Sequence, residues 1–286
     1  MIKNKTNVFK NIEKLGLTYS NEFLVPLDKQ SLSTNWWEAL KFFFDHSFAR
    51  GRSDELSIQY INFTIEALEE YLSINTENIE QCYLNLKDNT HYLDSSKIIQ
   101  FKSEKKVRNC INHPEFKLLA VENPILKILT TKRQIKGSKK YVYLNNDADV
   151  LMVFDVLKLI LDDNKKNIYN YIISTIQNKN TQTIYDELIS LRSVGDKIAS
   201  FVIRDIGLMN PGIIMNDYEH AFPVDTWVAK LAIKLGCNGE YTKIKNCLID
   251  ECLRNDIEPL KFAAGMWYLG THSFDILIEH FGEINL

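Results

Sequence analysis

A short segment between two helical patterns has the residue types of an anion-binding hairpin. One helical pattern ends at Leu191, the chain turns over about four residues, and a second pattern begins at Lys197. Gly195 supplies the backbone freedom that we expect the tight turn to need, and Val194 can fill the gap between the helices. The first N–H groups of the second helix have no partner within it, so they can bind a phosphate without a basic side chain. Taken alone, the same hairpin is equally compatible with simple helix packing.

A second motif follows some 30 residues later, in the segment Pro223-Val224-Asp225-Thr226-Trp227-Val228. Asp225 directly precedes a helical pattern that ends at Leu235, which is the position of an N-cap. An N-cap carboxylate is held ionised by backbone donors, and a fixed carboxylate can stabilise positive charge that develops in a reaction. Capping alone is the other interpretation of this residue.

Together, and in this order, the two motifs resemble the helix–hairpin–helix DNA glycosylases, the superfamily of endonuclease III and the 8-oxoguanine glycosylases. The family pattern is approximately Leu-x-Gly-Val-Gly-x-Lys-x-Ala, followed by Pro/x-Val-Asp-Thr-x-Val. Here the two parts are Leu191–Ala199 and Pro223–Val228. The resemblance is clear over residues 183–236 and extends over 147–269, and it is not visible in the first 140 residues.

The resemblance implies an all-α fold, with two helical subdomains and a DNA-binding cleft between them. We expect an N-terminal helical region over 1–145, the glycosylase domain with its helix–hairpin–helix motif over 146–258, and C-terminal helices over 259–286 that pack back on the N-terminal region. The implied partner is double-stranded DNA with a damaged base. The family expectation is a monomer that needs no metal and no cofactor.

The resemblance also assigns roles to individual residues. Lys197 stands where bifunctional members carry the catalytic lysine, and Asp225 stands where the family carries its essential aspartate. The implied activity is base excision with AP lyase cleavage: the damaged nucleotide is flipped out, Lys197 attacks C1′ to form a Schiff base, and Asp225 stabilises the developing positive charge. The residues expected to contact the DNA backbone are Arg192, Ser193, Val194 and Gly195.

The base pocket has candidates near both ends of the chain. His272, within Gly270-Thr271-His272-Ser273, is the best polar candidate. Aromatic rings can stack on a flipped base, although such residues more often belong to the core. The candidates are Trp36, Trp37, Phe44, Trp267, Tyr268 and Phe274. Arg50 and Arg52 lie between two helical patterns, where they could contact a phosphate or the unpaired base, or could be ordinary exposed loop residues.

The sequence departs from the family pattern at several points. Ser193 replaces the first hairpin glycine, which fits if its φ is negative. Trp227 stands where many members have His, and 210–219 is an apparent insertion. No four-cysteine run follows Asp225, so we expect no iron–sulfur cluster, which favours the 8-oxoguanine branch.

Hydrophobic periodicity predicts the elements that must position these residues. Helices are expected over 35–46, 54–74, 147–161, 165–177, 183–191, 197–208, 225–235, 259–269 and 273–281. Ser53 is the expected start signal of the second of these. Residues 90–101 are expected to hold short extended pieces, and the role of 75–145 stays open.

Composition excludes several classes of protein. The 286 residues carry 34 Lys+Arg against 37 Asp+Glu, so the chain is not polybasic, and its 45% apolar fraction can build a core. No apolar run approaches the length of a membrane span, and Met1–Lys10 lacks the apolar region of a secretory signal. We therefore expect a cytoplasmic protein of bacterial or archaeal type, associated with the nucleoid when it acts.

Two further features each have two interpretations. The five cysteines suit free thiols in a reducing compartment, and a zinc or iron–sulfur site at Cys237, Cys247 and Cys252 is the alternative. The basic run Lys132–Lys140 is either a solvated loop or a phosphate contact.

Three alternatives to the main hypothesis remain. A glycosylase of the same fold could act on another modified base, a non-catalytic module could bind DNA through the hairpin, and a helical scaffold could bind a protein. If Lys197 and Asp225 face one cleft, the enzymes are favoured, and if they point in opposite directions, the DNA-binding module is favoured. The helical scaffold explains neither motif.

Overall fold

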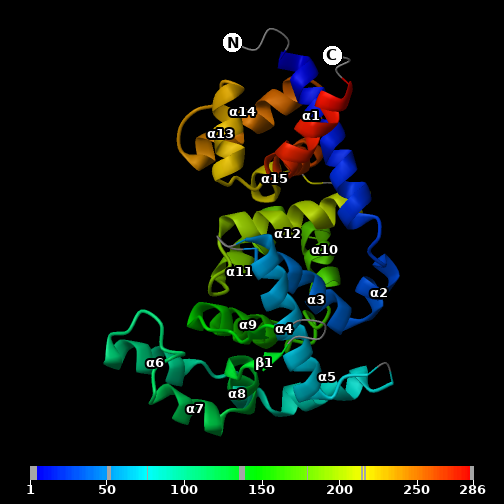
Figure 1. Ribbon diagram of the computed structural model, residues 1–286. Helices are drawn as coiled ribbons and strands as arrows, with labels where there is room; N and C mark the ends of the chain where they lie inside the picture. Colours follow the sequence, from blue (N-terminus) through cyan, green and yellow to red (C-terminus); the bar gives the residue numbers. More distant parts are fainter. Residues whose placement is uncertain are drawn as a thin grey trace. The chain divides into compact units, whose positions relative to one another are not determined.

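The described part of the chain is almost entirely helical (Figure 1). The computed structural model describes residues 5–49, 53–75, 77–134, 139–178, 180–213, 215 and 217–283, of which 5 and 274–283 are described by their backbone alone. Within these ranges the only strands are β1 (Arg133–Gln134) and β2 (Tyr141–Val142), an antiparallel pair with Arg133 opposite Val142. The predicted all-α class is therefore confirmed.

The chain divides into two compact units. Unit 1 comprises the described residues of Met1–Lys29, Ile172–Leu188 and Gly195–Leu286, and unit 2 comprises those of Gln30–Tyr171 and Ile189–Val194. These divisions differ from the expected boundaries at residues 145 and 258. The difference arises because the N-terminal helix belongs with the C-terminal half of the chain, which periodicity within one segment does not reveal.

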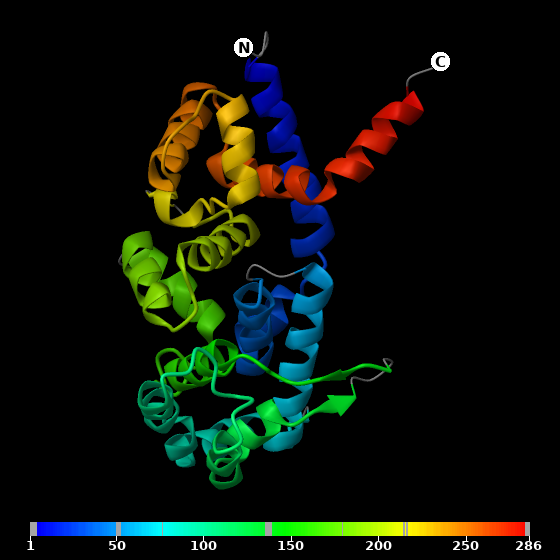
Figure 2. The same cartoon turned by 60° about the vertical axis from the view of Figure 1, so that its left-hand side comes forward.

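Unit 1 is built around two helices from opposite ends of the chain. Its elements are α1 (Lys5–Tyr19), η1 (Ser20–Leu24), most of α10 (Ile168–Asn178) and α11 (Thr181–Ser190), α12 (Asp196–Met209), η3 (Tyr218–Ala221), α13 (Thr226–Lys234), α14 (Tyr241–Arg254) and α15 (Pro259–Glu283). The helices α1 and α15 are in close contact, and Figure 2 shows them crossing. A Cβ on Gly265 would lie 1.8 Å from the carbonyl oxygen of Ile12, and one on Gly16 would lie 1.9 Å from that of Lys261. The two backbones touch, so only glycine fits at these two positions.

The core of unit 1 joins the loop before α13 to the helices around it. Phe222 and Val224 are almost fully buried, as is Val228 in the first turn of α13. They share a cluster with Phe262 of α15 and Leu248 of α14. Since apolar side chains are buried on both sides of Asp225, packing fixes the backbone at this carboxylate.

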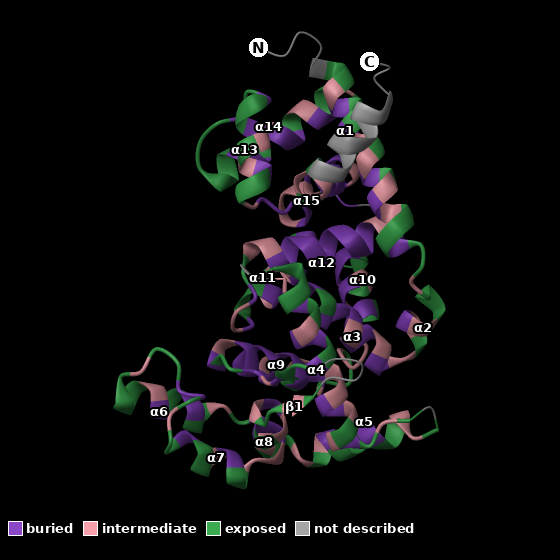
Figure 3. Ribbon diagram, in the orientation of Figure 1, coloured by how far each residue is buried: buried purple, intermediate pink, exposed green. Residues whose placement is uncertain are grey.

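Unit 2 has an aromatic core. Its elements are α2 (Lys29–Thr34), α3 (Trp36–Ser47), α4 (Asp54–Leu72), α5 (Ile79–Asp88), η2 (Thr90–Leu93), α6 (Ser96–Lys105), α7 (Phe116–Glu122), α8 (Pro124–Thr130), the two strands, and α9 (Asp147–Leu159). Phe43, Phe44, Phe63 and Phe154 are fully buried within it. Most of α9 is buried as well, as its apolar pattern predicted (Figure 3).

Helix start signals were predicted best. Ser53 caps α4 through a hydrogen bond from the N–H of Leu56, as predicted, and Asn35 caps α3 in the same way. The two expected C-terminal helices form the single helix α15, in which His272 (φ −110°, ψ 17°) breaks the helical geometry. Figure 2 shows the resulting bend between the two predicted segments.

One expectation about the elements is wrong, and two helices were missed. Residues 90–101 are helical rather than extended, and they belong to η2 and α6. The helices α1 and α14 were not predicted at all. The buried face of α14 carries Lys245 between its apolar residues, which weakened the periodic pattern.

The cysteines of unit 1 do not all remain thiols. Cys237 and Cys247 form a disulfide with their Cα atoms 5.7 Å apart, so the expectation of free thiols is wrong for this pair. The turn after α13 brings Cys237 beside α14, which carries Cys247. Cys252 stays a buried thiol, and burial raises its pKa. The alternative of a metal held by these three cysteines is therefore not realised.

The described residues contain neither a membrane-spanning helix nor a cluster of metal ligands. No helix there is both long and apolar enough to cross a lipid bilayer. No group of three or more His, Cys, Asp or Glu side chains is arranged to hold a metal ion in that part of the chain.

Candidate functional site

The turn between α11 and α12 has the geometry of a tight hairpin, but with an unexpected residue in the left-handed conformation. The helix α11 ends at Ser190, the N–H of Val194 donates to the carbonyl of Leu191 at 3.1 Å, and α12 begins at Asp196. Ser193 has φ +66°, and Gly195 has φ −101° and ψ 179°. The left-handed residue of this turn is therefore Ser193.

Two expectations about the turn are corrected. Ser193 does not have the negative φ on which its fit was thought to depend, and Gly195 does not supply the conformational freedom. Ser193 occupies the conformation that glycine prefers at the corresponding point of the family pattern, at a cost of roughly 1–2 kcal/mol for a side chain. Gly195 matters differently: an added Cβ there would meet nothing within 4 Å, so the backbone is open to an approaching group.

The first turn of α12 has no side-chain cap. Gly195 is its N-cap residue, and as a glycine it has no side-chain oxygen to accept from the N–H groups that follow. Val194 beside it is buried, and Lys197 is half-buried. An uncapped helix start with open space in front of it has the properties of an anion site.

An ion pair that the sequence analysis missed holds this helix start in place. Asp196 accepts from Lys245 Nζ of α14 at 2.9 Å and from the hydroxyl of Tyr185 of α11 at 2.8 Å. Lys245 is 5% exposed, whereas the side chain of Asp196 is 40% exposed, so water reaches the pair from the aspartate side. Burial and the bond to Asp196 raise the pKa of Tyr185, which keeps its hydroxyl protonated as the donor. The pair ties α11, α12 and α14 together.

A sequence signal for Lys245 existed. It is spaced four residues before Ile249 and seven before Cys252, which puts it on the buried face of α14. A lysine on a buried face needs an anionic partner, but the sequence does not say which of many carboxylates supplies it.

Arg192 is engaged inside unit 2. Its guanidinium makes a two-pronged contact with the carboxylate of Asp155 in α9, including Nε to Oδ2 at 2.6 Å, and donates to Ser95 Oγ at 2.7 Å. Its backbone N–H also donates to Asp155, at 2.9 Å. These contacts favour a structural role over the expected contact with DNA phosphate, because the fork of donors that would bind phosphate is already occupied.

Asp225 caps α13 as predicted. Its Oδ1 accepts from the N–H groups of Trp227 and Val228, each at 2.9 Å. Both bonds use one oxygen, and the residue is half-buried. The two bonds hold the carboxylate in a fixed orientation at the start of α13. Trp227, which replaces the family's His, is 53% exposed and has Lys230 Nζ 4.5 Å from its ring centroid.

The helices that carry Lys197 and Asp225 both pack against α15. Phe201 lies one turn after Lys197 on the same side of α12, and its ring centroid is 5.6 Å from that of Trp267 in α15. One turn further along α15, a Cβ on Gly270 would lie 3.1 Å from the Cβ of Trp227. The segment Trp267–Gly270 therefore contacts α12 one turn beyond the lysine and α13 two residues beyond the aspartate.

Three of the pocket candidates lie in one aromatic cluster of unit 1. The ring of His272 stacks on that of Tyr268 with centroids 4.4 Å apart. The ring of Phe23 is 6.3 Å from His272 and 6.2 Å from Trp267. Tyr268 donates to Glu22 at 3.0 Å and is buried, whereas Trp267 and His272 are only half-buried. The latter two keep surface that a base could reach.

A buried arginine lies beside this cluster and was also missed. Arg204 of α12 is fully buried, with its guanidinium 4.2 Å from the ring centroid of Phe201 and 4.7 Å from that of Tyr19. It donates to Asp205 at 2.8 Å, and the hydroxyl of Tyr19 donates to the same carboxylate at 2.5 Å. Burial and Asp205 raise the pKa of Tyr19. This network fixes α1 against α12.

The N-terminal candidates are core residues. Trp36 and Trp37 are each 2% exposed, and their indole N–H groups donate to the carbonyl of Ile79 and to Glu69, both at 3.1 Å. Phe44 is fully buried. Burial leaves no ring face accessible, so the prediction that these three rings stack on a flipped base is wrong. Their helical spacing places them in the core of unit 2.

Some predicted residues lie outside the described part of the chain. Arg50 and Arg52 are among these, as are residues 135–138 of the basic run, and the side chain of Phe274 is not described either. Arg133 and Lys140 of the run pair with Glu70 and Glu55.

Comparison of the chain with protein-family models, with curated proteins and with solved structures finds no match.

Proposed function

We propose that the chain is a DNA glycosylase with AP lyase activity that acts through Lys197 and Asp225. The observation that carries this proposal is the common packing of α12 and α13 on Trp267–Gly270 of α15, since it places an amine and a capped carboxylate on neighbouring elements of one unit. The aromatic residues Trp267 and His272, which keep exposed surface, lie on the same element. We propose them as the pocket for a base turned out of the duplex.

Each group has a role that follows from its surroundings. The uncapped start of α12 binds a phosphate of the damaged strand with its backbone N–H groups. The free oxygen of the Asp225 carboxylate faces the sugar, where it stabilises the positive charge that builds up as the glycosidic bond breaks. The neutral amine of Lys197 attacks C1′, and the base leaves with the bonding electrons and takes up a proton. The sugar ring then opens to a protonated Schiff base, loses a proton from C2′, and expels the 3′ phosphate, which nicks the strand.

The substrate to test first is 8-oxoguanine in duplex DNA. No four-cysteine run follows Asp225, and Cys237 and Cys247 are joined in a disulfide, which leaves no ligand set for the iron–sulfur cluster typical of the endonuclease III branch. This favours the 8-oxoguanine branch of the superfamily that the motifs resemble.

Borohydride trapping tests the proposal. The panel consists of duplexes with 8-oxoguanine opposite each of the four bases, an oxidised pyrimidine, uracil, or an abasic site, each incubated with the wild-type chain, Lys197→Gln and Lys230→Gln. Lys230 is an exposed lysine of α13 and serves as the matched control. We expect a covalent adduct with the wild type and Lys230→Gln and none with Lys197→Gln. An adduct of normal yield with Lys197→Gln would end the assignment.

A non-catalytic DNA-binding module is the second candidate, and one observation favours it. Both hydrogen bonds of Asp225 go to the backbone of its own helix, so capping alone accounts for this residue. Such a module would bind undamaged duplex through the start of α12 and would give no adduct on any duplex of the panel.

A further inference from the structure

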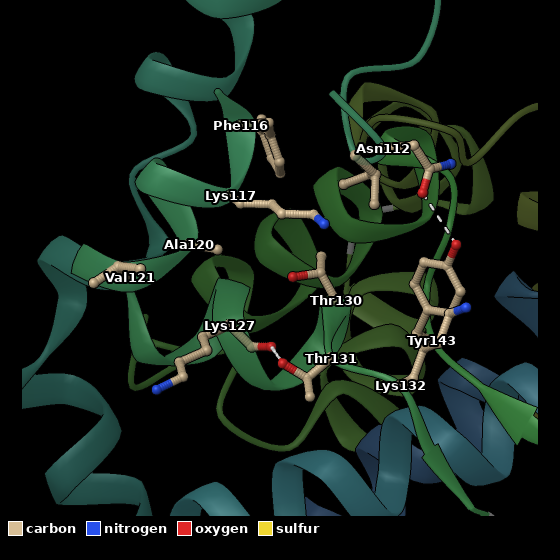
Figure 4. A pocket seen from close by; sticks show the side chains of 11 residues that line it. Asn112, Phe116, Lys117, Ala120, Val121, Lys127, Thr130, Thr131, Lys132 and Tyr143 are labelled. Carbon is tan, nitrogen blue, oxygen red and sulfur yellow. Dashed lines mark hydrogen bonds between the residues drawn. The ribbon is translucent and has the colours of Figure 1, made fainter. Parts of the chain in front are cut away.

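A cavity in unit 2 is lined by three lysines, one of which, Lys132, begins the basic run, and none of the residues proposed for catalysis lines it. Its volume is about 480 Å³, and it lies between α7, α8 and the segment around β2 (Figure 4). Lys117 extends from α7 into the cavity, Lys132 lies beside Tyr143, and Lys127 of α8 lies at the rim with its amine directed outward (Figure 4).

The charge of this cavity is not compensated by its surroundings. No acidic residue is among those that line it. In the described part of the chain, neither Lys117, Lys127 nor Lys132 has a carboxylate within ion-pairing distance, and Lys132 Nζ lies 5.4 Å from the ring centroid of Tyr143. Nearby lysines in the same unit are paired, such as Lys97 with Glu122. Unpaired cations that share one cavity favour an anionic ligand.

The remaining polar groups are mainly acceptors. The hydroxyls of Thr130 and Thr131 donate to carbonyls of α8, each at 2.7 Å, and that of Tyr143 donates to Asn112 at 3.0 Å. Since these hydroxyl protons are used, the oxygens can only accept from a ligand. The ligand that satisfies this cavity carries an anionic group for the lysines and N–H or O–H donors for the hydroxyl oxygens.

The opposite wall is apolar. Its accessible surface is mainly Val121 of α7, which is 73% exposed, and the buried side chains of Ile111, Phe116 and Ala120 lie behind it. The volume lies in the range of small-molecule sites, and an apolar wall facing a few polar groups is their usual composition.

We propose that this cavity binds a nucleotide. The phosphate lies at Lys117 and Lys132, the sugar hydroxyl or base N–H groups donate to Thr130 and Thr131, and the base lies against the apolar wall. The nucleotide is either free or part of a single strand, because both present the same phosphate, sugar and base. This inference does not depend on Lys197 or Asp225.

Isothermal titration calorimetry with the full chain tests the proposal. The probes are adenosine 5′-monophosphate, a five-residue oligodeoxyadenylate, adenosine and inorganic phosphate. We expect the two nucleotide probes to bind at least tenfold more tightly than adenosine or phosphate. The oligonucleotide binds more tightly if the source is a strand, and the mononucleotide binds at least as tightly if the source is a free nucleotide.

Variants locate the binding. Lys117→Gln and Lys132→Gln each weaken binding of the better nucleotide probe by about tenfold, the size expected for one charged hydrogen bond. For a strand, each also lowers the slope of log affinity against log salt concentration by about 0.7. Lys97→Gln is the matched control, because Lys97 is an exposed lysine of the same unit that pairs with Glu122, and it changes the affinity less than twofold. Thermal melting confirms that each variant is folded.

Three results would overturn the proposal: no binding of either nucleotide probe, inorganic phosphate binding as tightly as the nucleotides, or an equal loss with Lys97→Gln and Lys117→Gln. Failure of this inference is distinguishable from failure of the proposed glycosylase, because nucleotide binding is tested with Lys117→Gln and Lys132→Gln, whereas the glycosylase is tested by covalent trapping with Lys197→Gln.

Discussion

The helices α12 and α13 begin in opposite ways, although both pack on α15. The start of α13 is closed, because Asp225 accepts from two of its N–H groups. The start of α12 is open, because Gly195 offers no side chain and a Cβ there would meet nothing within 4 Å. The charge pair of Asp196 and Lys245 links the first turn of α12 to α14 and so fixes the position of this helix start. The comparison shows one helix start whose backbone donors stay open and one whose capping carboxylate is held in place, and the proposed function uses both properties.

The strongest test of the closed end is Asp225→Asn. Asn caps a helix about as well as Asp, so the free energy of unfolding should change by less than about 1 kcal/mol. The charge is lost, so the rate of base excision should fall by about 10²–10³-fold, the usual size for removing one preorganised electrostatic contact. Single-turnover release of the base measures the rate. If Asp225→Asn excises the base at a rate within threefold of wild type, Asp225 acts only as a helix cap.

The frame that carries both helix starts is tested by Gly265→Ala. The new methyl group would overlap the carbonyl of Ile12 in α1, and neither backbone can move without displacing α15. We expect the free energy of unfolding to fall by about 3 kcal/mol, the upper range for overpacking. Denaturant unfolding measures it, with Gly212→Ala as the control because a Cβ there meets nothing. Equal stability of the two variants would contradict the close approach of α1 and α15.

The open end can be closed by Gly195→Asp. The added carboxylate would cap α12 and raise stability by a few tenths of a kcal/mol, while it competes with and repels a phosphate. We expect the affinity for duplex DNA to fall by about tenfold. Gly195→Ser caps the helix without adding charge, so its affinity for duplex DNA should fall less than that of Gly195→Asp. Fluorescence anisotropy gives the affinities, and unchanged binding by Gly195→Asp would mean that no phosphate lies at this helix start.

The smallest effect concerns Ser193. The variants Ser193→Gly and Ser193→Ala both lack the hydroxyl and differ in their tolerance of φ +66°. Despite the larger chain entropy of glycine, Ser193→Gly should be more stable than Ser193→Ala by about 1 kcal/mol. Thermal and urea unfolding of the pair measure the difference, and a reversed order would contradict the left-handed turn.

The parts that were predictable from the sequence depend on neighbours in the chain. The caps at Ser53 and Asp225 were predictable because a cap bonds to N–H groups two or three residues away. The break at His272 falls between two periodic segments, and for the same reason it was visible in the pattern.

The parts that were missed depend on partners far away in the sequence. Nothing near Trp36 distinguishes a core ring from a binding ring, since its partner Ile79 is 43 residues away. Asp196 finds Lys245 at a separation of 49 residues, and Tyr19 finds Asp205 at 186. The left-handed residue of the turn was assigned to Gly195 because glycine favours that conformation, whereas in the structure Ser193 adopts it.

The central claim is that the amine of Lys197 forms the covalent bond to the sugar. Its most direct test begins with the wild-type chain bound to an abasic duplex. Borohydride reduces the Schiff base to a stable adduct, which is then digested, and mass spectrometry locates the modified residue. The account predicts a single modified peptide that contains Lys197. Modification of the N-terminal amine or of any other lysine, with Lys197 unmodified, would contradict it.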